Sequence, residues 1–128
     1  MTRPQARRAE RALDGDERAP GEARRFVREH LGSWECDGLI ESATLVVSEL
    51  VTNAVLHGHS DCRVRLMLGP EALRIEVEDE GPGEPEVQPV DIERFGGRGL
   101  LLVSAVSERW GIEHLEAGGK VVWAELAR

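Results

Sequence analysis

The chain is organised around the segment Ser48-Glu49-Leu50-Val51-Thr52-Asn53-Ala54-Val55-Leu56-His57-Gly58. The segment belongs to a run from about Asp37 to His57 whose apolar residues recur at helical spacing, which predicts one long helix with one apolar face. Glu49, Asn53 and His57 are four residues apart, so they line one side of that helix. A carboxylate can accept a proton, and an amide oxygen suits a hard cation such as Mg²⁺. Glu49 and Asn53 are therefore a candidate base-and-metal pair, although a solvated helix flank explains the same pattern.

The composition describes one acidic globular domain. The chain has 128 residues and a formal net charge of −8, which suits a single hydrophobic core and argues against a nucleic-acid-binding surface. Cys36 and Cys62 form neither a metal-binding pattern nor a disulfide framework, as expected of thiols in a reducing cytosol. No apolar run has membrane length, and no signal-peptide core follows Met1. We therefore expect a cytoplasmic protein that binds neither nucleic acid directly nor a membrane.

The first 20 residues are expected to be an N-terminal segment separate from the domain at 21–128. Within this segment, the pattern from Arg7 to Leu13 suits either a helical turn or an edge strand, and a disordered segment is the alternative. Its arginine cluster fits a contact with a phosphate or an acidic partner, or a solvated chain end. A helix is predicted from Gly21 to about Leu31, with Pro20 in its first turn. Asp37 is predicted to be the N-cap of the long helix.

The rest of the chain predicts two hairpins and one more helix. Alternating residues predict strands over 62–68 and 73–79, joined by the turn at 69–71. A loop rich in Gly and Pro runs to about residue 97, and a loop of that length is more often functional than idle. A helix follows from residue 99, and a second hairpin spans about 107–115 and 120–126. This order predicts an α+β two-layer sandwich, with a mixed, mostly antiparallel sheet and helices on one face.

Two more segments carry candidate chemistry. In Asp79-Glu80-Gly81-Pro82-Gly83, a carboxylate at a strand end can accept a hydrogen bond from an exocyclic amine, or it simply caps a turn. In Gly96-Gly97-Arg98-Gly99-Leu100, free N–H groups at a helix start and the Arg98 charge favour an anion such as a phosphate. A flexible connector also explains these glycines. The segment is neither a dinucleotide-binding fingerprint nor a Walker loop.

Together, the three segments resemble a known set of nucleotide-binding boxes. Glu-x-x-x-Asn-Ala on a helix, Asp-x-Gly-x-Gly after a strand and Gly-x-Gly-Leu opening a helix occur in the GHKL (histidine-kinase-like) ATPase superfamily. The resemblance runs from about residue 21 to the C-terminus. The stretch from Glu49 to Gly58 is most similar to bacterial anti-sigma-factor serine/threonine kinases. The resemblance implies the Bergerat-type ATP-binding fold, with ATP and Mg²⁺ as ligands.

The resemblance also implies a role for each matching residue. Glu49 would be the general base, and Asn53 would bind the Mg²⁺ that holds the ATP phosphates. Asp79 would accept a hydrogen bond from the adenine amino group, while Gly81 and Gly83 would let the backbone pass close to the nucleotide. The loop at 84–96 would be the ATP lid. The opening of the last helix would hold the phosphates through Gly97, Arg98, Gly99 and Leu100.

The implied function is an ATP-dependent serine/threonine kinase that phosphorylates an anti-anti-sigma partner and sequesters a sigma factor. Homodimerisation is typical of the family, and no sequence patch here decides it. One alternative is a non-catalytic ATP-binding regulatory module that acts by protein contact only, and another is an orphan histidine-kinase catalytic domain. The chain departs from the family at Gly118-Gly119-Lys120-Val121, where a threonine hydroxyl often helps to bind adenine. Val121 is expected to offer an apolar wall there instead.

Overall fold

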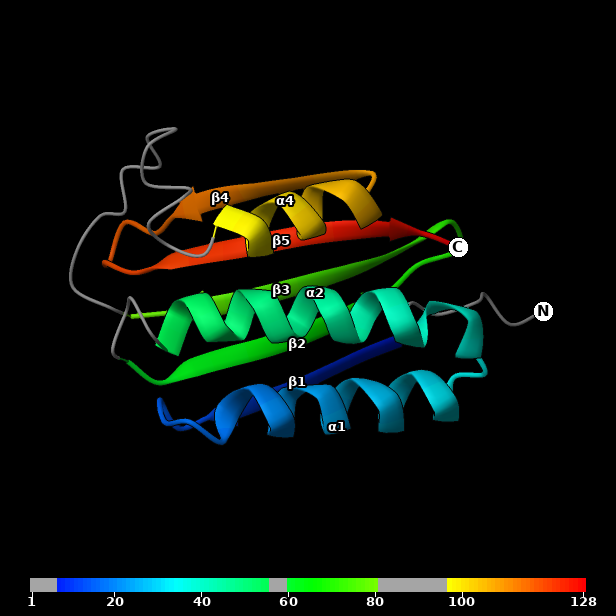
Figure 1. Cartoon of the computed structure of the whole chain (residues 1–128), viewed down its shortest axis with the longest axis horizontal. Helices are drawn as coiled ribbons and strands as arrows, with labels where there is room; N and C mark the ends of the chain where they lie inside the picture. Colours follow the sequence, from blue (N-terminus) through cyan, green and yellow to red (C-terminus); the bar gives the residue numbers. More distant parts are fainter. Residues whose placement is uncertain (1–6, 56–59, 81–96) are drawn as a thin grey trace.

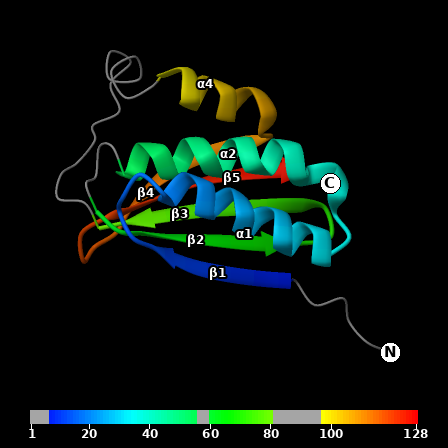
Figure 2. The same ribbon diagram turned by 60° about the horizontal axis from the view of Figure 1, so that its bottom comes forward.

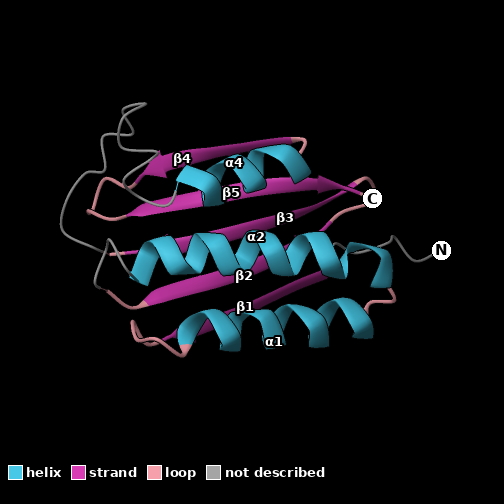
Figure 3. Ribbon diagram, in the orientation of Figure 1, coloured by secondary structure: helices cyan, strands magenta, loops and turns pink. Residues whose placement is uncertain are grey.

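The computed structural model describes residues 7–55, 60–80 and 97–128. Five strands form one sheet in the order β1-β2-β3-β5-β4, and every pairing in this described part is antiparallel. The sequence predicted a mixed, mostly antiparallel sheet, and the antiparallel part of that prediction is confirmed, while no described pair of strands is parallel. The elements, shown in Figures 1 and 3, are β1 (Arg7–Leu13), α1 (Ala19–Ser33), the 3₁₀ turn η1 (Asp37–Leu39), α2 (Ile40–Asn53), β2 (Cys62–Leu68), β3 (Ala72–Asp79), α4 (Gly97–Val106), β4 (Arg109–His114) and β5 (Lys120–Ala127).

Helices α1, α2 and α4 lie on one face of the sheet, so the predicted α+β two-layer sandwich is confirmed (Figure 2). Alternate residues of β3, namely Leu73, Ile75 and Val77, are buried beneath the helices. Helix α1 contributes Phe26 and Val27 to the same core. None of the helices in the described ranges is long and apolar enough to cross a membrane.

The helices differ from the prediction mainly at their ends. Helix α1 starts at Ala19 with Pro20 in its first turn, as its fixed φ angle favours. Asp37 is not an N-cap, because it lies inside the 3₁₀ turn that precedes α2, and the N-cap of α2, Leu39, makes no side-chain cap hydrogen bond. The α-helix ends at Asn53 and continues as a wider π turn. The last two residues of the predicted helix, 56 and 57, lie outside the described residues.

The segment from Arg7 to Leu13, for which the sequence left a helical turn, an edge strand or disorder open, forms strand β1. Residues Arg7–Leu13 form an edge strand that pairs with all seven residues of β2. The predicted hairpins are also confirmed, with Leu68 opposite Leu73 in the first and His114 opposite Lys120 in the second. Short turns determine both registers, which is why the alternation pattern was sufficient to predict them.

The face of the sheet opposite the helices, which we call the open face, carries a network of ion pairs. Arg65 donates to Glu76 at 3.0 Å and to Glu78 at 2.7 Å, and Arg74 donates to Glu76 at 2.8 Å and to Glu125 at 3.1 Å. Burial opposes the charge of Glu76, but the hydrogen bonds from Arg74 and Arg65 outweigh it and hold its pKa below the ordinary value. The polar face is thus stabilised by charge pairing across strands.

Candidate functional site

The ends of four secondary-structure elements lie together at one end of the sandwich. The C-terminal end of α2, the end of β3, the start of α4 and the start of β5 lie together on the left of Figure 1. These ends carry the three segments that the sequence singled out, although the segments are far apart along the chain. The fold therefore supplies one place where the predicted residues can act on a common ligand.

Helix α2 brings Glu49 and Asn53 to this end. Of the three residues between them, Leu50 and Val51 are buried in the core, and this fixes the rotation of the helix. Glu49 and Asn53 are half-buried on the flank and lie one helical turn apart. Arg24 of α1 donates a hydrogen bond of 2.9 Å to the Ser48 hydroxyl, directly before Glu49, which ties the two helices together. His57 lies outside the described residues.

Asp79 ends β3 and is the one polar or charged residue that is buried in the described part of the chain, with 1% of its surface exposed. Lys120, the first residue of β5, is its partner across the two strands. The Lys120 Nζ atom lies 3.3 Å from Asp79 Oδ2 and 3.5 Å from Oδ1. A carboxylate this deeply buried requires compensating charge or hydrogen bonds, and Lys120 supplies both.

Lys120 contacts a predicted site residue, Asp79, and no pattern in the sequence signalled this contact. The sequence predicted that Val121 forms an apolar wall beside the adenine, but side chains alternate along a strand, so adjacent residues face opposite sides. Val121 pairs with Glu78, which belongs to the open face, whereas Lys120 shares the helix side with Asp79. Val121 therefore lies on the face of the sheet opposite to Asp79, so it does not flank the Asp79 carboxylate as the prediction required. The pairing of β3 with β5, which no local pattern reveals, determines which of the two residues meets Asp79.

Two further neighbours of Asp79 are Cys62 and Gly119. Cys62 of β2 lies opposite it, and burial, with the nearby charges of Asp79 and Asp61, raises the pKa of the Cys62 thiol to about 11. Cys62 is therefore a neutral thiol at neutral pH. Gly119 has a φ of +90°, and a Cβ atom there would lie 2.6 Å from the Asp79 carbonyl oxygen. Only glycine allows this close approach of the two strand ends.

The start of α4 and the preceding loop are described in part. The helix begins at Gly97, two residues earlier than predicted, so Gly97, Arg98 and Gly99 all belong to its first turn. Leu100 is 9% exposed and belongs to the core, where it anchors this turn. The predicted nucleotide contacts at Gly81 and Gly83, and the predicted lid at 84–96, lie outside the described residues.

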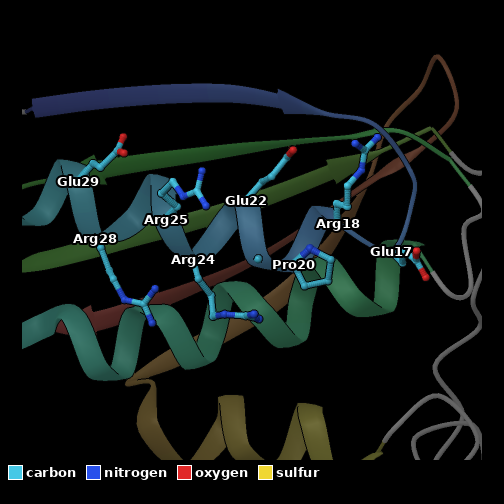
Figure 4. A pocket seen from close by; sticks show the side chains of 9 residues that line it. Glu17, Arg18, Pro20, Glu22, Arg24, Arg25, Arg28 and Glu29 are labelled. Carbon is cyan, nitrogen blue, oxygen red and sulfur yellow. The ribbon is translucent and has the colours of Figure 1, made fainter.

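A groove of ≈ 630 Å³ runs along α1. Its described lining does not include the site residues predicted from the sequence, and Figure 4 shows Arg24 and Arg28 directed toward α2. The lining mixes both charges, and it consists of Glu17, Arg18, Pro20, Gly21, Glu22, Arg24, Arg25, Arg28 and Glu29. This groove is a separate surface feature, and it carries no part of the site at the end of the sandwich.

The groups at the end of the sandwich fit a nucleotide and its metal ion. The buried Asp79 carboxylate is an acceptor suited to an amine, and Lys120 is a donor beside it. Mg²⁺ is usually held by one or two protein oxygens together with phosphate oxygens and water, and the half-exposed Asn53 offers one such oxygen. Glu49 supplies a carboxylate for proton transfer one turn away. The described residues thus offer one group suited to each of base binding, metal binding and general-base action.

Comparison with known proteins gives a consistent result. A family model for the histidine kinase-like ATPase domain matches residues 14–126. The chain is also similar to a crystal structure of the RsbU and RsbW domains of Rv1364c from Mycobacterium tuberculosis, with a TM-score of 0.70 and 25% sequence identity. That match covers 95% of this chain but 33% of the other, so the chain spans about a third of that structure's length. No curated protein sequence matches the chain significantly.

Proposed function

The chain belongs to the histidine kinase-like ATPase domain family, and on that premise we propose that it is an ATP-binding regulatory protein with serine/threonine kinase activity. Its protein substrate would be an anti-anti-sigma factor, and it would also bind and sequester a sigma factor in the cytoplasm. The similarity to a structure that contains an RsbW domain supports this class of partner. The observation that supports the proposal is that the C-terminal end of α2, which carries Glu49 and Asn53, lies at the same end of the sandwich as the end of β3, which carries Asp79.

Each residue has a defined task in the proposed reaction. The oxygen of the partner's hydroxyl group forms a bond to the γ-phosphorus of ATP, and the bond from that phosphorus to the bridging oxygen breaks, so that ADP leaves with the electron pair. The Glu49 carboxylate takes the hydroxyl proton. Its half-buried position on α2 leaves it accessible to a partner protein. Asp79 holds the adenine at the buried end of the site.

Asn53 and the start of α4 would serve the phosphate end. The side-chain oxygen of Asn53 would hold Mg²⁺, which when bound neutralises charge on the phosphate oxygens. The free N–H groups in the first turn of α4 and the Arg98 guanidinium favour the same anion. Gly97 and Gly99 allow close approach of the backbone, and Leu100 anchors the turn in the core. Gly81 and Gly83 would pass beside the nucleotide.

Glu49→Gln is the variant that tests the proposed chemistry. We expect it to bind Mg-ATP as the wild type does but to lose phosphoryl transfer by about 10²–10⁴-fold, because a general base contributes that much. Glu41→Gln is the matched control, since Glu41 lies in the first turn of the same helix, near its opposite end. The assay is transfer of labelled phosphate to an anti-anti-sigma protein encoded near this chain, with binding measured by calorimetry.

The other outcomes separate the competing hypotheses. ATP binding without transfer would support a non-catalytic regulatory module that acts by contact. An acid-labile product would indicate transfer to histidine, as in a histidine-kinase catalytic domain. If the wild type binds no ATP at millimolar Mg-ATP, the proposed function is refuted.

A further inference from the structure

Lys120 stands out because of its residue type. It is the only lysine in the chain, and the other 15 of the 16 Lys and Arg residues are arginines. The ion pairs of the open face all use arginine, as at Arg65 and Arg74. The single lysine is placed instead on the helix side of the sheet, against the buried carboxylate of Asp79.

The difference between the two side chains explains what a lysine allows here. An arginine presents a planar fork that engages both oxygens of a carboxylate at once. A lysine ammonium is a compact charge with three donors that rotate freely. Lys120 can therefore keep one hydrogen bond to Asp79 and direct another donor to a ligand. Its side chain is 14% exposed and that of Asp79 is 1% exposed, so the lysine is the more accessible member of the pair.

The geometry places a donor next to an acceptor. The Lys120 Nζ atom is 3.3 Å and 3.5 Å from the two Asp79 oxygens. At this separation the ammonium group and the carboxylate can each form a hydrogen bond with one of two neighbouring atoms on the edge of a ligand ring. Adenine has a matching edge, in which the C6 amino group donates and the adjacent ring nitrogen N1 accepts. Enzymes commonly recognise a base by hydrogen bonds along this edge.

We propose that Lys120 contacts the base of the bound nucleotide and donates a hydrogen bond to N1 of adenine, while Asp79 accepts one from the amino group. This inference rests on the proposed function, because it requires that ATP binds at Asp79. It assigns to an ammonium group the place beside adenine where the resemblance led us to expect a threonine hydroxyl. Lys120 is thereby a specificity-determining residue for the base.

The test is a cycle of two proteins and two nucleotides. Wild type and Lys120→Met are each titrated with ATP and with 1-deaza-ATP, in which a C–H group replaces N1. We expect the wild type to bind 1-deaza-ATP about tenfold more weakly than ATP, the loss typical of one hydrogen bond from a charged donor. Lys120→Met should bind the two nucleotides equally. Equal discrimination in both proteins would show that Lys120 only supports Asp79, and would overturn the inference.

A second measurement does not depend on the variant folding. Because the chain contains one lysine, ¹⁵N labelling of lysine side chains gives a single ammonium signal in the wild-type protein. We expect ATP to shift this signal and 1-deaza-ATP to shift it much less. Equal shifts with both nucleotides would overturn the inference while leaving ATP binding intact. A wild type that binds neither nucleotide would instead refute the proposed function, so the two failures are distinguishable.

Discussion

Replacing Asp79 with asparagine should reveal how strongly the ion pair with Lys120 stabilises the fold. At a separation of 3.3 Å, the gross attraction of two unit charges is about 5 kcal/mol at an effective dielectric constant near 20. Burial of the carboxylate offsets most of this, because removing an ion from water costs several kcal/mol. We therefore expect a net coupling between the two side chains of about 1–3 kcal/mol, in the range measured for contacting residues.

A double-mutant cycle measures that coupling directly. The free energy of unfolding is obtained from urea titrations, followed by circular dichroism, for wild type, Asp79→Asn, Lys120→Met and the double variant. The cycle cancels the other interactions of Asp79, so only its interaction with Lys120 is left. We expect each single variant to be destabilised and the double variant to lose less than the sum of the two. Additive losses within about 0.5 kcal/mol would refute the view that the pair stabilises the strand ends.

Two further predictions concern the same sheet. Gly119→Ala should destabilise the protein by about 2–5 kcal/mol, because a left-handed φ costs about 1–2 kcal/mol and overlap with the Asp79 carbonyl oxygen adds about 1–3 kcal/mol. Gly118→Ala should incur only the first cost, since nothing lies within 4 Å of its added Cβ atom, and equal losses in urea titrations would contradict the argument. The hydrogen bonds from Arg74 and Arg65 hold the native pKa of Glu76 below its ordinary value. Its stabilising contribution is therefore complete above the ordinary pKa and is lost as the pH falls through the native pKa. Urea titrations from pH 6 to about pH 3 should show a steeper fall in wild type than in Glu76→Gln, whereas the exposed-site control Glu71→Gln should follow the wild type.

Local sequence patterns were sufficient to predict most of the fold. The alternation in 62–68 and 73–79 identified both strands, and the three-residue turn between them left one register that buries Leu73, Ile75 and Val77. The position of Asp37 was predicted less well, because a 3₁₀ turn and an α-helix share the same local composition. Asp37, which the sequence predicted as the N-cap, therefore lies inside the 3₁₀ turn that precedes α2.

Prediction of the site was limited by long-range pairing. Glu49 and Asn53 could be proposed as a pair because both lie on one helix, where four-residue spacing is enough to place them together. Lys120 meets Asp79 only because β5 is inserted between β3 and β4. The two residues are 41 positions apart, and the sequence between them carries no sign of that register. Which of Lys120 and Val121 lies on the same face as Asp79 depends on the register between β3 and β5. A shift of that register by one residue would exchange the two side chains.

The ammonium group of Lys120 also changes the electrostatics of the site in a way that a hydroxyl would not. A buried Asp79 carboxylate beside a hydroxyl would leave a full negative charge at the end of the site that we propose binds the base. Lys120 makes the pair neutral, so that a polyphosphate approaching the same end meets less repulsion. This matters in a chain with a net charge of −8, whose overall field opposes anions. The lysine would then serve ATP in two ways, through a hydrogen bond to the base and through compensation of the one charge that the fold buries among its described residues.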